Sequence, residues 1–305
     1  MRNLAIDYLK VGLAYLVLVL HSGIFMHDIP VLGFMLINGV CRIAVPIFLL
    51  ISGYYFVHIA TPDKLRGWLV RLVVLYLLWM IIYSPFWFDE RHLKSLVNLA
   101  IGFYALWYFP GVIIAGVMLY LMRGVRASVL LAVASALYLT GFAIQLAGNT
   151  HVMTGKLDTL FNWYPFYRNA VFYCFPVLAL GYVMKRDGLW SKLRIRKWHA
   201  VAVIALVVAE SLANYAIVGN EPLDLMLVLP LASVVIFLYV KDQNLHGVGN
   251  NAAMFSVAVF LIHPMWYLLY SELNVNMPKI VFTLVMTTIS AMLLVAANKR
   301  LKYIL

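Results

Sequence analysis

The stretch R-I-A-V-P-I-F-L-L-I-S-G-Y-Y-F, residues 42–56, decides how this chain folds. It lies in an apolar run over residues 31–57, so Arg42 stands where lipid is expected. A charge at bilayer depth costs roughly 2.5–3.5 kcal/mol even on lenient scales, and such a residue usually faces a bundle interior or a wet cavity. Pro46 removes a backbone donor and loosens the helix there. The Ser52-Gly53 pair permits a close helix approach at the far end.

The composition around this stretch is that of a membrane protein. Hydrophobic residues make up 65% of the 305 residues and charged residues 11%, whereas soluble domains carry about 25% charged residues. Apolar runs long enough to span a bilayer recur at about 4–24, 35–57, 67–84, 105–122, 127–147, 169–184, 200–218, 223–240, 252–271 and 280–297. The sequence therefore predicts an all-α, polytopic transmembrane bundle of about ten helices, with residues 1–305 forming one domain.

The net charge of +11 follows this topology and does not indicate a nucleic-acid surface. With the N-terminus inside, 17 of the 23 Lys and Arg residues fall on the inner side, one (Arg42) in the membrane, and five on the outer side, namely Arg91, Lys94, Lys156, Arg168 and Lys279. The positive-inside rule therefore predicts that both termini are cytoplasmic. The two cysteines lack metal-ligand spacing, so no disulfide or metal site is expected.

Two motifs resemble those of a known family. Residues 42–54 are similar to its R-x-x-V-P-x-F-F-x-x-S-G-F segment, and D-Y-L-K, ten residues and His21 are similar to its first-helix D-x-x-R-x10-H. On these motifs the whole chain resembles the acyltransferase-3 family of bacterial membrane O-acetyltransferases, in the form without a periplasmic hydrolase-like extension. Lys10 replaces the family's arginine, which keeps the charge but loses the planar fork.

The spacing of these residues predicts a shared site. Lys10 and His21 are eleven residues apart, so in a helix they share a face and lie about 16 Å apart along the axis. The second helix returns from the outer side, which brings Arg42 to a depth comparable with that of His21. A histidine suits a general base, and an arginine suits an oxyanion or a phosphate. We therefore predict His21 and Arg42 as the catalytic residues.

The resemblance also implies the substrates. The donor would be acetyl-CoA, or another acyl-CoA, from the cytosol, and the acceptor a hydroxyl on a lipid-linked or extracytoplasmic glycan. The predicted substrate- and donor-binding residues are Asp7, Lys10, Ser52, Tyr54, Trp107, Tyr108, Arg168 and His263. Trp107 and Tyr108 are equally well explained as an aromatic belt at the interface, and His263, beside Pro264, as a packed residue at a helix kink.

A transporter or flippase without covalent chemistry is the competing hypothesis, because mid-membrane Arg42, Glu210 and His263 are also typical of transporters. No inverted repeat is apparent, and the motif spacing favours the enzyme. The expected location is the bacterial inner membrane, with membrane lipid as a partner and a homo-oligomer left open. The sequence also leaves open the acceptor sugar, the acyl chain, and whether transfer is direct or passes through an acyl-histidine.

Overall fold

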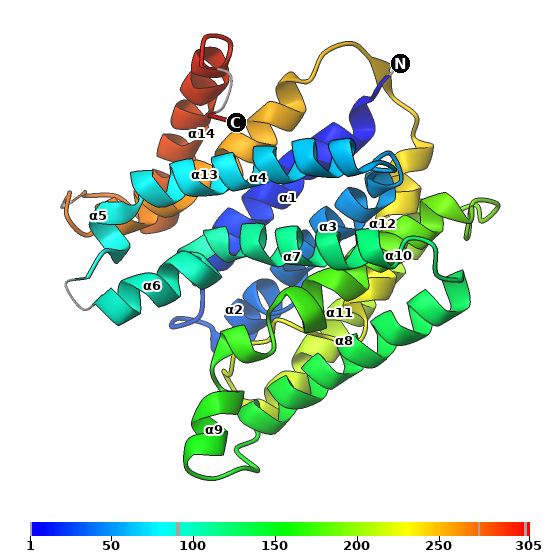
Figure 1. Cartoon of the computed structure of the whole chain (residues 1–305). Coiled ribbons are helices and arrows are strands. Elements are labelled where there is room, and N and C mark those ends of the chain that lie inside the picture. The colour runs from blue at the N-terminus through cyan, green and yellow to red at the C-terminus, as the bar shows by residue number, and fades with distance from the viewer. Residues whose placement is uncertain (1, 90–91, 274, 302–303) are drawn as a thin grey trace.

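The computed structural model describes residues 2–89, 92–273, 275–301 and 304–305 (Figure 1). In chain order the helices are α1 (Leu4–Ser22), α2 (Pro30–Ile37), η1 (Val40–Ile43), α3 (Ala44–Phe56), α4 (Pro62–Ile82), α5 (Ser84–Trp87), α6 (His92–Ile101), η2 (Tyr104–Trp107), α7 (Tyr108–Leu121), α8 (Ala127–Asn149), α9 (Lys156–Phe161), η3 (Tyr164–Phe166), η4 (Ala170–Cys174), α10 (Phe175–Arg186), α11 (Lys197–Val218), α12 (Leu229–Asp242), α13 (Asn251–Tyr270) and α14 (Lys279–Asn298). Two short strands, β1 (Arg2–Asn3) and β2 (His246–Gly247), pair antiparallel. Arg91 and Lys302, which the charge count includes, lie outside the described residues.

The predicted polytopic helical bundle is confirmed. Each of the ten predicted apolar runs contains a helix, and eight segments of the described chain are long and apolar enough to cross a membrane. The other two runs hold α10, of 12 residues, and α12, of 14 residues. At 1.5 Å per residue such helices fall short of a hydrocarbon core about 30 Å thick.

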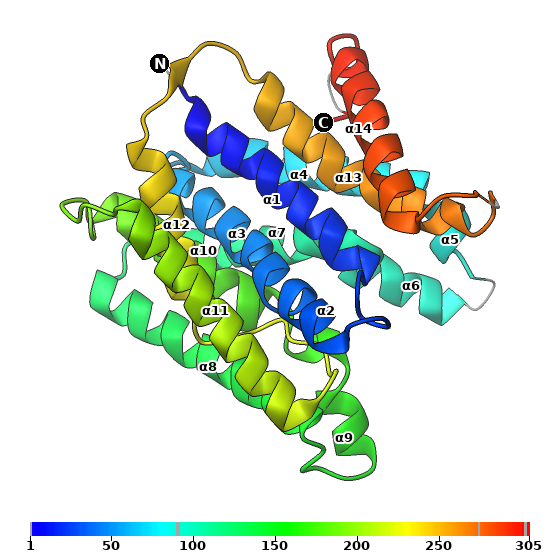
Figure 2. The same cartoon turned by 180° about the vertical axis from the view of Figure 1, so that it is seen from behind.

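The stretch around Arg42 forms the centre of the bundle. Between residues 30 and 56 the apolar window is 67% buried, against 22% for α4, α8, α11 and α14. Of these outer helices, α8 and α14 lie at opposite edges of the bundle (Figures 1 and 2). The predicted close approach at Gly53 is confirmed, because a Cβ there would lie 1.9 Å from the carbonyl oxygen of Leu178 in α10. Gly181 approaches Leu50 in the same way, so α3 and α10 pack backbone against backbone.

The second predicted helix is broken, and the break lies earlier than Pro46. Helix α2 ends before Asn38, and at Gly39 a Cβ would lie 2.2 Å from the carbonyl oxygen of Met35. Pro46 is the third residue of α3, where its missing N–H removes no intrahelical hydrogen bond. The break, and not the proline, therefore presents Arg42 from the short 3-10 turn η1.

Hydrogen bonds join several of the basic connections at one end of the bundle. Asn3 donates to the carbonyl oxygen of Lys241 at 2.8 Å, beside the β1–β2 pair. Arg186 donates to the carbonyl oxygens of Arg123 and Val125 at 2.8 and 2.9 Å. Both chain ends lie in the upper half of Figure 1. This grouping agrees with the charge asymmetry, and the orientation in the membrane stays a prediction.

Candidate active site

Two cavities meet inside the bundle. The smaller has a volume of about 30 Å³, and the ionisable residues His21, Arg42, Arg168 and Asp224 are part of its lining. The larger has a volume of about 520 Å³. The two predicted catalytic residues, His21 and Arg42, thus both line the smaller cavity, which we call the inner pocket.

His21 occupies the last turn of α1, just before the left-handed cap residue Gly23 at φ 61°. Its ring lies 4.7 Å from that of Tyr104 and stacks on that of His263 at 5.4 Å, both between centroids. Tyr104 has φ 51°, a left-handed conformation that is strained for a bulky residue and often marks a functional site. Within the described chain no residue hydrogen-bonds the His21 ring, so both ring nitrogens are available to a substrate.

His263 is fully buried in α13, next to the in-helix proline Pro264. Its Nδ1 lies 3.2 Å from the carbonyl oxygen of Val259, whereas its Nε2 has no partner among the described residues. The Tyr83 hydroxyl repairs the helix at the proline, since it donates to the carbonyl oxygen of Leu261 at 2.6 Å and accepts from the N–H of Met265. His263 therefore packs beside the in-helix proline and stacks on His21, and its predicted role in binding stays a prediction.

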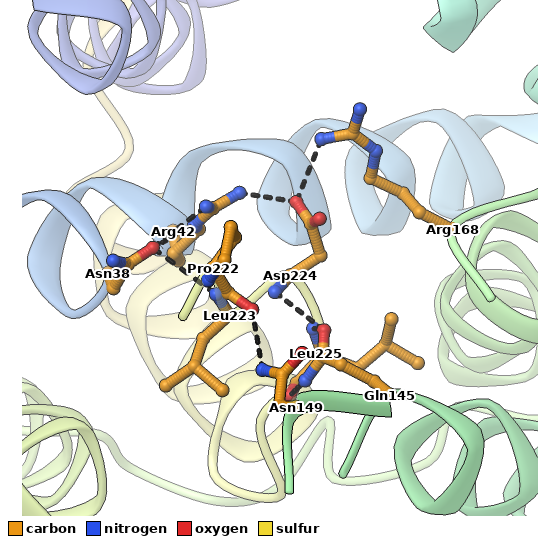
Figure 3. A network of polar contacts seen from close by, with 9 residues as sticks. All are labelled: Asn38, Arg42, Gln145, Asn149, Arg168, Pro222, Leu223, Asp224 and Leu225. Atoms are coloured by element: carbon orange, nitrogen blue, oxygen red, sulfur yellow. Dashed lines mark hydrogen bonds and ion pairs between the residues drawn. The ribbon is translucent and has the colours of Figure 1, made fainter. Parts of the chain in front are cut away.

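Arg42 belongs to a buried ionic cluster with Asp224 and Arg168 (Figure 3). Both arginines donate from Nη1 to the same oxygen of Asp224, Arg168 at 2.9 Å. The Nε and Nη2 groups of Arg42 also donate to Oδ1 of Asn38, at 3.2 and 2.8 Å. Asn38, one turn earlier in the same segment, therefore satisfies part of the guanidinium group.

The carboxylate of the cluster is held from α8. Gln145 accepts from the backbone N–H groups of Asp224 and Leu225 at 2.7 and 3.0 Å, and Asn149 donates to the carbonyl oxygen of Pro222 at 2.9 Å (Figure 3). The guanidinium groups of Arg168 and Arg42 both bind the Asp224 carboxylate and so favour its ionised form. Asp224 is therefore an anion, fixed in the non-helical connection before α12.

Arg168 is also held by aromatic rings. Its guanidinium carbon lies 4.7 Å from the Trp107 ring centroid and 4.3 Å from that of Tyr164. Asn169, the next residue, accepts from the N–H groups of Val171 and Phe172 and so begins the π-helical turn η4. Two guanidinium groups and one carboxylate give the wall of the inner pocket a surplus positive charge, which suits a developing oxyanion.

The larger cavity, which we call the donor cavity, has three basic residues in its lining, Arg2, Lys10 and Arg71. Phe48, Phe56, Trp68 and Met254 are among the apolar residues of its walls. Asp7 is buried behind this basic group; it accepts two hydrogen bonds from Arg2 and lies 4.0 Å from the Lys10 ammonium.

Seven of the ten predicted site residues line one or both cavities, whereas Asp7, Tyr54 and His263 line neither. Of the seven, the inner pocket is lined by His21, Arg42, Trp107, Tyr108 and Arg168, and the donor cavity by Lys10, Ser52 and Tyr108. Ser52 and Tyr108 also contact each other through their hydroxyl groups at 3.4 Å. Tyr54 packs against Phe237, with ring centroids 4.9 Å apart, whereas its neighbour Tyr55 lines the donor cavity.

Sequence reasoning missed Asn38, Tyr104, Gln145 and Asp224. Asp224 carried a usable signal, because it is a charged residue inside the predicted apolar run 223–240. Glu210, which was noted without a role, accepts hydrogen bonds from the N–H groups of Leu227 and Val228 at 2.6 and 2.8 Å. It therefore satisfies backbone donors just before α12 and takes no part in the site.

Comparison with known proteins identifies the family. The family model described as an acyltransferase domain matches residues 3–296. Similar proteins include an amino-acid racemase of Enterococcus faecalis, 23% identical over 301 residues, and a serine/alanine racemase of Enterococcus gallinarum, 24% identical over 295 residues. These matches cover 91% and 87% of this chain but 43% and 41% of the racemases, so the chain spans less than half their length. No solved structure matches the chain significantly. Since the acyltransferase model matches nearly all of its length, the chain belongs to the acyltransferase-3 family.

Proposed function

We propose that this protein is an O-acetyltransferase of a bacterial inner membrane. It moves an acetyl group from cytosolic acetyl-CoA to a hydroxyl of a lipid-linked or extracytoplasmic glycan. The observation that carries the proposal is the position of His21. Its unbonded ring faces a pocket that contains two guanidinium groups and meets a cavity large enough for a coenzyme arm.

The lining and volume of the donor cavity favour a coenzyme A ester as the acyl donor. Arg2 and Lys10, near the N-terminus, and Arg71 line the cavity, and their positive charges would bind the phosphates of the coenzyme. Tyr108 lines this cavity and also the inner pocket. At about 520 Å³ the cavity lies within the range of small-molecule sites, and its apolar walls suit the flexible arm of the coenzyme.

The chemistry is one acyl transfer with His21 as the general base. The imidazole takes the proton of the acceptor hydroxyl while the hydroxyl oxygen attacks the thioester carbonyl carbon. The tetrahedral oxyanion then collapses: the carbon–sulfur bond breaks, the new carbon–oxygen ester bond remains, and the imidazolium returns the proton to the thiolate. The products are the acetyl ester and the free thiol of coenzyme A. An acyl-histidine route would use the same residues in two steps.

The arginines have different tasks in this mechanism. Arg42 has its Nε and Nη2 groups on Asn38 and its Nη1 on Asp224, so it is held rigidly. Arg168 has its Nε without a partner in the described chain and shares Asp224 with Arg42. Their surplus positive charge stabilises the oxyanion, a contribution that removal of a single donor usually shows as a loss of about 10²–10³ in kcat.

The acceptor approaches from the opposite side to the coenzyme. Arg168 is the last residue of the proposed outer segment 148–168, and Tyr164 of the same segment covers its guanidinium group. Aromatic and polar side chains of this kind suit a sugar, so a glycan hydroxyl is the proposed acceptor. The proposed orientation places both termini and the basic residues of the donor cavity on the cytoplasmic side.

His21→Ala tests the proposal. Purified protein receives acetyl-CoA labelled in the acetyl group together with a lipid extract from the host membrane, and thiol release and label transfer are both measured. We expect His21→Ala to fold and to lose about 10²–10⁴ in rate, as loss of a general base does. His27→Ala is the matched control, because His27 is exposed in the loop after α1. Equal rates in the two variants would remove His21 from the role of base.

A carrier without covalent chemistry is the second candidate. Two adjoining cavities inside a bundle are also compatible with a carrier, and the racemase names of the relatives refer to amino acids, which are polar solutes. The same experiment distinguishes the two, since a carrier releases no thiol from acetyl-CoA and transfers no label.

A further inference from the structure

The inner pocket and the donor cavity share three lining residues: Val45, Tyr108 and Phe260. We call these three residues the neck. The rings of Tyr108 and Phe260 meet edge to face, with centroids 5.7 Å apart. Tyr108 is held on one side by Ser52, at 3.4 Å between hydroxyl oxygens. On the side of the inner pocket, the ring of Phe260 lies 6.1 Å from that of His263 between centroids, and the His263 ring stacks on His21.

The volumes on the two sides of the neck differ greatly. A water-sized group needs at least about 10–15 Å³, so the 30 Å³ of the inner pocket admits about two such groups. An acetyl group is about that size. The donor cavity, at about 520 Å³, has ample room for the arm that carries the thioester.

We propose that the neck selects the acetyl group over longer acyl chains, a proposal that rests on the acyltransferase function above. The acyl end of the donor must pass Tyr108 and Phe260 before its carbonyl carbon comes within reach of His21. Each further methylene would then have to enter the inner pocket, where Leu20 and Trp107 complete the wall. Pockets of this kind discriminate by about 10–200-fold for one methylene.

Phe260→Ala tests the proposal, because it opens the neck without touching a charged residue. Thiol release is measured for acetyl-, butanoyl- and hexanoyl-CoA, and the hexanoyl-to-acetyl rate ratio is compared between variants. We expect a low ratio in the wild type and an increase of at least about tenfold in Phe260→Ala. Phe255→Ala is the matched control: Phe255 is half-buried on the same helix, but it packs against Tyr15. Its ratio should equal that of the wild type.

The outcomes separate the neck from the function on which it depends. If the wild type releases no thiol from acetyl-CoA, the acyltransferase proposal fails. If the wild type works on acetyl-CoA and Phe260→Ala keeps the wild-type ratio, the neck does not select the acyl group. Phe260→Leu replaces Phe260→Ala where the smaller residue lowers the yield of folded protein, and the same ratio decides.

Discussion

Replacing Asp224 by asparagine should destabilise the protein more than replacing either arginine. Asp224 is 5% exposed and accepts hydrogen bonds from both Arg42 and Arg168. Asn keeps the shape and one acceptor oxygen but removes the only negative charge of the cluster. Leaving buried charges uncompensated typically costs about 3–5 kcal/mol, so we expect the free energy of unfolding to fall by about that amount.

The cluster holds two positive charges and one negative charge. Because of this imbalance, removing the negative charge and removing one positive charge should have different costs. Arg168→Gln leaves the Arg42–Asp224 pair intact, so it should cost only the charged hydrogen bond, about 1.5–3 kcal/mol. In the double variant Arg168→Gln/Asp224→Asn one uncompensated guanidinium is removed. Its cost should therefore fall below the sum of the two single costs by about 1–3 kcal/mol.

Chemical unfolding in detergent, followed by tryptophan fluorescence, measures these differences. Arg186→Gln serves as the matched control, because Arg186 lies at the other end of the bundle and bonds only carbonyl oxygens and its neighbour Asp187. Additive costs, or a smaller loss in Asp224→Asn than in Arg168→Gln, would show that the charges of the cluster do not depend on one another.

Two further predictions concern packing and topology. Gly53→Ala should lower the yield of folded protein, because its Cβ would meet a carbonyl oxygen at 1.9 Å, whereas Gly12→Ala, which meets nothing within 4 Å, should be neutral or stabilising; yields in detergent compare them. Cysteines introduced at Leu157 and Lys192 should react with an impermeant thiol reagent from outside and inside respectively, and labelling from the same side would contradict the topology.

The sequence predicted how α3 packs against its neighbour better than it predicted where the helix before it breaks. Ser52-Gly53 predicted a close approach because a glycine in an apolar helix removes the side chain that separates two backbones. Leu178 and Gly181 of α10 fill that space. The helix break was assigned to Pro46, because proline is the residue that usually breaks a helix. A proline in the first turn of a helix removes no intrahelical hydrogen bond, however. The break lies instead at Asn38 and Gly39, where Oδ1 of Asn38 accepts a hydrogen bond from the N–H of Leu223.

Asp224 illustrates which part of the site could be predicted from the sequence. An arginine at membrane depth requires a partner, and the apolar runs contain three carboxylates: Asp7, Glu210 and Asp224. Asp7 belongs to the D-x-x-K motif at the opposite end of the first helix from His21, so the choice for Arg42 falls on Glu210 or Asp224. Composition cannot separate these two, because the depth of each depends on where its helix begins. Asp224, 182 residues from Arg42, is available only because α12 begins at Leu229, whereas the carboxylate of Glu210 binds the backbone ahead of that helix. The charge requirement thus predicts that a partner exists, and the helix boundary decides which residue it is.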